Sequence, residues 1–114
     1  MTDEIALLDR ASDIIRKGWT QGTYARNEAG QPVGALDKEA CQWCLRGALK
    51  RADNFDHASL SVYGIKVYQR VLQSLSNSIF PQSLASWNDE KGRTQADVIK
   101  ILEEGKLLSF NKEK

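Results

Sequence analysis

The chain has 114 residues, of which 41% are hydrophobic and 27% charged, and its formal net charge is +1. This length suits one domain with one core, and the composition is that of a folded globular protein rather than a disordered one. A near-neutral charge argues against non-specific nucleic-acid binding, which needs a basic excess. No apolar run approaches the roughly 20 residues that cross a bilayer, and the acidic N-terminus does not resemble a signal peptide. We therefore expect a cytoplasmic protein without membrane association, whose cysteines are reduced.

Apolar residues near the N-terminus recur with helical periodicity. A cap at Thr2 or Asp3 precedes them, and Lys17 and Gly18 form a suitable end. The sequence therefore predicts a first helix between this cap and this end. Its buried face comprises Ile5, Leu7, Leu8, Ala11, Ile14 and Ile15.

Residues 19–36 break the helical pattern. Asn27 and Gly30 lie where a tight turn would need them, between two short extended stretches. We expect a two-stranded hairpin or an irregular loop here, packed on the helices because an isolated hairpin is unstable.

A second helix is expected over about residues 38–53, with Asp37 as its N-cap. Its apolar stripe includes Cys41 and Cys44 and continues through Ala48 and Ala52.

The remaining helices complete the predicted fold. The pattern favours a third helix over about residues 59–78, one helical turn at 82–87, and a last helix that Thr94 caps and Gly105 ends. The predicted class is all-α, with about four helices and the hairpin or loop insert in a single domain spanning residues 1–114.

Cys41 and Cys44 form a Cys-x-x-Cys pair, which can hold metal or carry redox chemistry. A zinc site needs more soft ligands, and His57 is the sole histidine. Because the pair falls within the apolar stripe, core packing is the favoured interpretation. Thiol chemistry and metal binding remain alternatives, and no metal or cofactor is expected.

Trp43 falls nearly opposite the apolar stripe of the predicted second helix, on the same side as Arg46 and Lys50. An aromatic ring beside two cations can stack a base, a nucleotide or a partner's side chain. The structural alternative is that the hairpin covers this side, with Tyr24 or Val33 against Trp43.

Two further segments carry candidate binding residues. In the loop after the first helix, Arg26 can recognise an anion or satisfy loop carbonyls. In the turn over residues 87–94, Asn88 or Asp89 suits an Asx turn, and Arg93 near a helix start can bind a carboxylate or phosphate. An Arg93–Asp89 ion pair that holds the loop is the structural alternative.

The chain lacks the recognised catalytic signatures. It contains no Gly-x-Ser-x-Gly elbow, no phosphate-binding loop of the Walker type and no His-Glu-x-x-His motif. The sequence therefore favours a non-enzymatic protein, without deciding the matter.

Three ordered motifs carry a family resemblance. They are Gly18-Trp19-Thr20-Gln21-Gly22 with Ala25-Arg26, then Cys44-Leu45-x-Gly47-Ala48-Leu49, then Trp87-Asn88-Asp89 with Gly92-Arg93-Thr94. With these, the chain resembles a family of short uncharacterised proteins of bacteriophages and bacteria. The resemblance implies a phage context and no particular activity.

Two functions follow as hypotheses. The first is a phage-type accessory protein that binds a host protein in the host cytoplasm, for example to inhibit a bacterial defence system. The alternative is a small-molecule or nucleotide binder, possible only if the three motifs meet at one pocket. Binding of DNA through Arg46, Lys50 and Arg51 is disfavoured by the net charge, and a homodimer is compatible with either hypothesis. The candidate binding residues are Arg26, Trp43, Arg46, Lys50, Asn88, Asp89 and Arg93.

Overall fold

The computed structural model of the protein describes residues 3–53 and 84–112. These residues form four helices and a small three-stranded antiparallel sheet, so the fold is mostly helical rather than purely all-α. In chain order the elements are α1 (Asp3–Lys17), β1 (Ala25–Arg26), β2 (Pro32–Val33), β3 (Gln42–Trp43), α2 (Leu45–Asp53), α4 (Leu84–Asp89) and α5 (Gln95–Lys112).

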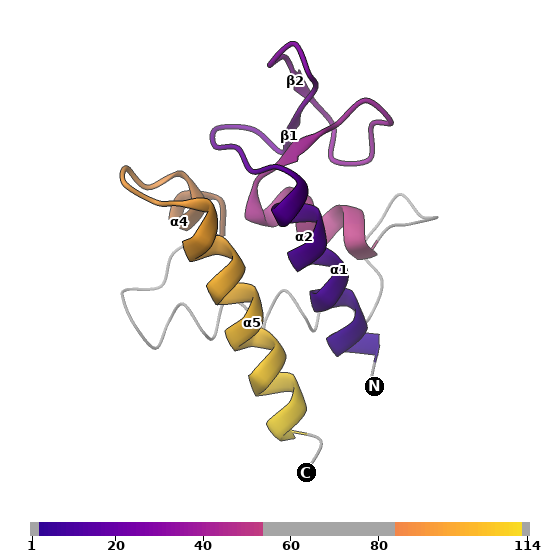
Figure 1. Ribbon diagram of the computed structural model, residues 1–114, viewed down its shortest axis with the longest axis vertical. Coiled ribbons are helices and arrows are strands. Elements are labelled where there is room, and N and C mark those ends of the chain that lie inside the picture. The colour runs from indigo at the N-terminus through magenta and orange to yellow at the C-terminus, as the bar shows by residue number, and fades with distance from the viewer. Residues whose placement is uncertain (1–2, 54–83, 113–114) are drawn as a thin grey trace.

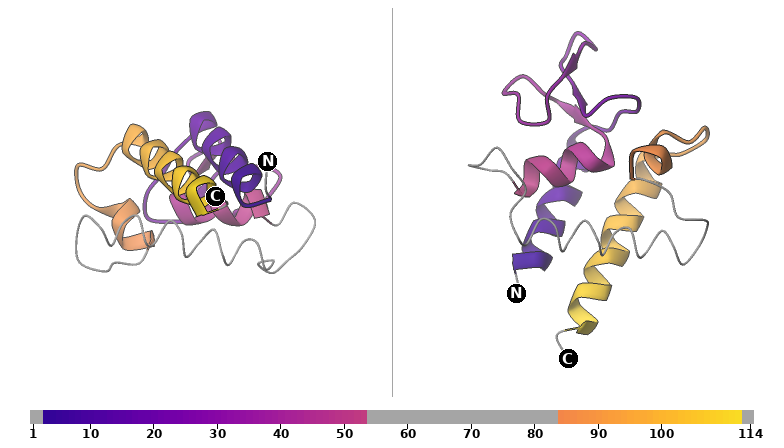
Figure 2. Two further views of the ribbon diagram at one scale, coloured as in Figure 1. Left: turned by 90° about the horizontal axis from the view of Figure 1, so that it is seen from below. Right: turned by 180° about the vertical axis from the view of Figure 1, so that it is seen from behind.

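Helices α1 and α5 lie side by side and run in opposite directions, and α2 crosses α1 (Figure 1). The sheet lies beyond the C-terminal end of α1, and α4 lies near the start of α5 (Figure 2). No helix within the two described ranges has the length and apolar character needed to span a membrane.

The core lies where α1, α2 and α5 meet, and the sheet and α4 close it at one end. It combines aliphatic side chains from the helices with two tryptophans, one from β3 and one from α4. The most buried large apolar members are Leu7, Leu8, Ile15, Trp43, Leu45, Leu49, Trp87, Val98, Ile101 and Leu102. Burial of this apolar surface is the main favourable contribution to the free energy of folding.

The predicted first helix and hairpin are confirmed. Helix α1 ends where the Gly18 amide donates to the Ile15 carbonyl, at 3.1 Å. In the hairpin turn, Asn27 Oδ1 accepts a hydrogen bond from the Gln31 amide at 3.0 Å, and Gly30 has a φ of +81°. A positive φ is costly for residues with a Cβ, so glycine suits this position.

The predicted helix over residues 38–53 is wrong in its first half. Residues 42–43 form strand β3, which pairs with β1 in the register Ala25↔Trp43, and α2 begins only at Leu45. Backbone partners on both sides satisfy amides of this segment: the Cys41 amide donates to the Arg26 carbonyl of β1 at 2.9 Å, and the Trp43 amide donates to the Gly18 carbonyl, just after α1, at 3.1 Å. The apolar residues whose spacing indicated one helix are divided between strand β3 and the shorter helix α2.

The C-terminal helix begins as predicted and extends further than predicted. The Thr94 amide donates to Asp97 Oδ2 at 3.0 Å, and the Asp97 amide donates to Thr94 Oγ1 at 3.1 Å, which is a reciprocal capping arrangement. The helix continues past Gly105 to Lys112, and contacts with α1 extend beyond the glycine, since Lys106 forms an ion pair with Asp9 on α1.

The predicted turn at 82–87 corresponds to α4, whereas the helix predicted over about 59–78 lies outside the described residues.

Gly47 provides a test of how tightly α2 packs against the sheet. A Cβ at this position would lie 2.1 Å from the Tyr24 carbonyl oxygen, whereas nothing lies within 4 Å of a Cβ at Gly34. We expect Gly47→Ala to lower the free energy of unfolding by about 1–3 kcal/mol, although alanine is the better helix former. Gly34→Ala should change it by less than about 0.5 kcal/mol. Urea unfolding of both variants measures the difference, and equal stabilities would contradict this packing.

Candidate functional site

The side chain of Asn88 is the point at which the three sequence motifs meet. It is completely buried. Its Oδ1 accepts hydrogen bonds from Trp19 Nε1 at 2.7 Å and from the Leu45 amide at 3.0 Å. Its Nδ2 donates to the Thr20 carbonyl at 3.1 Å and to Asp89 Oδ1 at 3.0 Å. Two acceptor positions and two N–H groups are all that an amide side chain offers, so Asn88 has no capacity left for a ligand.

A second set of bonds surrounds this amide. Gln21 Nε2 donates to the Asn88 carbonyl at 2.9 Å and to the Glu90 carbonyl at 3.2 Å. The Gly22 amide, at a φ of +84°, donates to Asp89 Oδ1 at 2.9 Å. We call the hydrogen bonds among residues 19–22, Leu45 and residues 88–90 the Asn88 junction. The junction joins the loop after α1, the start of α2 and the end of α4.

Arg93 is held by its own turn. Its Nε donates to the Trp87 carbonyl at 2.9 Å, and its guanidinium carbon lies 4.0 Å from the centre of the Trp87 ring. The carboxylate that pairs with it is that of Glu90, at 2.5 Å, rather than that of Asp89. Two of the five N–H donors of this guanidinium, and its stacking contact with Trp87, are therefore used within the turn.

Arg26 is likewise committed to its own loop. Its guanidinium donates to Thr20 Oγ1 at 2.8 Å, to the Gly30 carbonyl at 3.0 Å and to the Gln21 carbonyl at 3.1 Å. These bonds fix the loop after α1 against the hairpin turn.

Trp43 does not lie on an outer helical face with Arg46 and Lys50, because it belongs to strand β3. Only 4% of its surface is exposed, and its Nε1 donates to the Ala35 carbonyl at 3.2 Å. The guanidinium of Arg51 covers the ring at 5.1 Å. Trp43 is thus part of the core, and its strand pairs with β1 of the hairpin.

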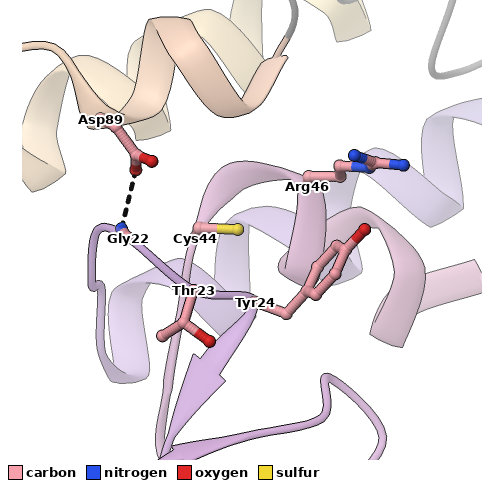
Figure 3. Close-up of a pocket in the computed structure, with 6 residues that line it drawn as sticks. All are labelled: Gly22, Thr23, Tyr24, Cys44, Arg46 and Asp89. Atoms are coloured by element: carbon pink, nitrogen blue, oxygen red, sulfur yellow. Dashed lines mark hydrogen bonds between the residues drawn. The ribbon is translucent and has the colours of Figure 1, made fainter.

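A pocket of about 360 Å³ opens next to the Asn88 junction. Its walls come from all three motif segments, and Figure 3 shows Cys44 between Asp89 on one side and Tyr24 and Arg46 on the other. Of the sequence-predicted residues, Asp89 and Arg46 line it. The full lining is Gly22, Thr23, Tyr24, Cys44, Arg46 and Asp89.

Tyr24 carries two cations at the edge of this pocket. The Arg46 guanidinium lies 5.3 Å and the Lys50 ammonium 5.6 Å from the centre of its ring. Tyr24 is 39% exposed, whereas Ala25, the next residue, is fully buried in β1. From the sequence, Tyr24 was expected only as a possible cover for Trp43. Tyr24 immediately precedes β1. The alternation of side chains expected for the short extended stretch around residue 25 was the signal that could have placed Tyr24 outward.

A second hollow, of about 550 Å³, lies between the hairpin turn and the segment before β3. It is lined by loop residues of mixed charge, including Glu28, Lys38 and Glu39, and by Cys41. None of the predicted binding residues reaches it.

The two cysteines are separate free thiols. They flank strand β3, where three residues span about 10 Å, beyond the reach of a disulfide. Burial raises the pKa of the Cys44 thiol, the charge of Asp89 adds to this effect, and hydrogen bonds from backbone amides oppose it. Cys44 is therefore a neutral thiol at pH 7 and a poor nucleophile. No cluster of three or more metal-ligating side chains occurs among the residues described.

Comparison with protein-family models identifies the family. The chain belongs to the family of unknown function DUF6197, whose model matches residues 1–106. Comparison with curated proteins and with solved structures gives no significant match.

Asn88→Asp tests the junction. The carboxylate cannot donate to the Thr20 carbonyl, and it is buried beside Asp89, so we expect a loss of about 3–5 kcal/mol of unfolding free energy at pH 7. Burial raises the pKa of such a carboxyl, so the fold binds the proton more tightly than the unfolded chain does. The deficit relative to wild type should therefore shrink as the pH falls from 7 to 4.

Denaturant unfolding at both pH values measures this deficit. Asp89→Asn keeps the acceptor for the Gly22 amide and serves as the control, with a much smaller loss expected. A pH-independent deficit, or equal losses in the two variants, would contradict the role of Asn88.

The thiols offer a second test. The variant Cys41→Ser leaves Cys44 as the thiol to be measured, and Cys44→Ser leaves Cys41. We expect Cys44 to react with a chromogenic disulfide reagent far more slowly at pH 7 than Cys41 does. The reason is that Cys44 is 5% exposed and its pKa is raised, whereas Cys41 is partly exposed. Stopped-flow rates across pH 6–9 measure this, and a faster Cys44 would contradict the assignment of an unreactive thiol.

Proposed function

We propose that this member of the family acts by binding a partner protein, and that the contact surface is Tyr24, Arg46 and Lys50 with the pocket they border. We call these three residues and the pocket the Tyr24 face. The observation that carries the proposal is that Tyr24, an exposed aromatic ring, carries two cations at the mouth of a pocket.

The way in which the motif residues are used supports binding over catalysis. Asn88, Arg26 and Arg93 spend their hydrogen bonds on neighbouring backbone and side chains. Cys44 is a neutral thiol. Among the residues that the structure describes, the polar groups of the Tyr24 face and the outer oxygen of Asp89 form no pair of nucleophile and base.

The composition of the face suits an interface. Tyrosine and arginine are enriched among the residues that contribute most to protein–protein affinity, because they combine a large contact area with hydrogen-bonding groups. An exposed ring beside a concave surface gives a partner both an anchor and a place to insert a side chain.

The backbone under the face is held firmly in place. The Tyr24 carbonyl accepts a hydrogen bond from the Cys44 amide at 3.1 Å, and α2 packs against it at Gly47. A face built on fixed elements loses little conformational entropy on binding.

The resemblance to proteins of bacteriophages and bacteria suggests the setting. A phage-encoded chain would meet its partner in the cytoplasm of the host, and inhibition of a defence protein is one form that such binding takes.

A second function is favoured by one observation. The pocket volume of about 360 Å³ is within the range of small-molecule sites, and its walls come from all three motifs. A small molecule or nucleotide bound there would appear in native mass spectrometry as a mass excess that Arg46→Ala removes. The protein-binding proposal predicts no such excess.

Affinity capture tests the protein-binding proposal. We expect the wild-type chain to retain a host protein from a cell lysate, and Tyr24→Ser to reduce its recovery at least about tenfold, the effect of losing an interface residue worth 1.4 kcal/mol or more. Leu36→Ser is the matched control, because Leu36 is 41% exposed against 39% for Tyr24 but does not line the pocket. Recovery unaffected by Tyr24→Ser, or no protein retained above the bare matrix, would contradict the proposal.

A further inference from the structure

The arrangement of charges on the Tyr24 face indicates what kind of partner it fits. We propose that the partner presents an acidic peptide segment, an inference that rests on the proposed function. An Asp or Glu carboxylate of this segment binds Arg46 and Lys50, and a neighbouring N–H or O–H group donates to Asp89.

Arg46 and Lys50 place two like charges side by side on α2. They are four residues apart on α2, which is one helical turn, and like charges at this spacing destabilise a helix. The Tyr24 ring attracts both cations but carries no negative charge. Within residues 3–53 and 84–112, neither cation has a carboxylate in ion-pair contact.

Other basic side chains contrast with this pair. Arg16, Arg93 and Lys106 each lie within 3.4 Å of a carboxylate oxygen. The pair on the Tyr24 face is therefore a place where an external carboxylate would relieve repulsion and form charge-assisted hydrogen bonds with a guanidinium.

The opposite wall of the pocket adds a requirement. Asp89 Oδ1 accepts from the Gly22 amide and from Asn88 Nδ2, whereas no donor to Asp89 Oδ2 occurs in the described part of the chain. An occupant must therefore bring a donor to this side and an anion to the side of Arg46. A peptide meets both needs, since each residue supplies a backbone N–H beside its side chain.

The same arrangement disfavours nucleic acid. A phosphate backbone is bound by a row of cations, but Arg51, the next basic residue of α2, donates instead to the carbonyls of Ala35 and Asp37, at 3.0 and 2.9 Å. The carboxylate of Asp89 would also repel a polyanion that followed the pocket. One carboxylate among neutral donors fits this surface better than a chain of phosphates.

Selection from a bead library of random linear peptides tests the inference with the full-length chain. We expect peptides retained by the wild type to be enriched several-fold in Asp and Glu. Arg46→Glu/Lys50→Glu should lose this enrichment and favour Lys and Arg instead, because charge complementarity determines the choice of partner. Lys17→Glu/Lys100→Glu is the matched control. It makes the same change in net charge at two exposed lysines outside the face and should retain the wild-type preference.

Circular dichroism of each variant establishes that it is folded before selection. Peptides retained without an acidic preference, a preference that survives the charge reversal, or no retained peptide would each overturn the inference. Affinity capture from lysate, with the wild type compared with Tyr24→Ser, decides the proposed function separately. Binding of a labelled DNA duplex at physiological salt that requires Arg46 and Lys50 would overturn the inference in favour of nucleic acid.

Discussion

The buried amide of Asn88 is the interaction on which the rest of the structure depends. Its four hydrogen bonds connect the loop after α1, the start of α2 and α4. The first N–H groups of a helix have no partner within the helix. The first of them in α2 is the Leu45 amide, and Asn88, distant in sequence, provides its acceptor. Because unpaired buried polar groups cost about 1–3 kcal/mol each, the three segments are held in one relative position.

This constraint explains why the motif residues are poor candidates for direct binding. A side chain that holds three segments together must direct its polar atoms inward, as Asn88, Arg26 and Gln21 do. Binding groups are then provided by the neighbouring residues that the junction positions. The pocket forms beside the junction, where the loop, α2 and α4 come together without filling the space between them.

The parts of the fold that were predictable depend on local signals. Helix α1 follows from its apolar period, the hairpin from Asn27 and Gly30, and the start of α5 from Thr94 and Asp97. Residues 38–44 were mispredicted because their apolar spacing suits a helix equally well. The deciding interaction is pairing with Ala25, which no local pattern reveals.

The candidate site was predictable only in part. Arg46, Lys50 and Asp89 were named from their residue types, and the structure places them at or beside one pocket. Trp43 was expected to share a face with the cations only because a helix was assumed at its position. Tyr24, which immediately precedes β1, takes the position beside the cations that was expected for Trp43, whereas Ala25 faces the core. Whether a motif asparagine faces a ligand or the interior depends on tertiary contacts, which the sequence does not display.

Hydrogen exchange measured by NMR tests the central claim, that the motifs form an internal junction rather than an open binding site. The Leu45 amide and the Trp19 indole N–H both donate to Asn88 Oδ1. The account predicts that both protons exchange as slowly as core helical amides, through global unfolding. Exchange of either proton at the rate of an exposed loop amide would show that Asn88 is open to solvent, and would contradict the account.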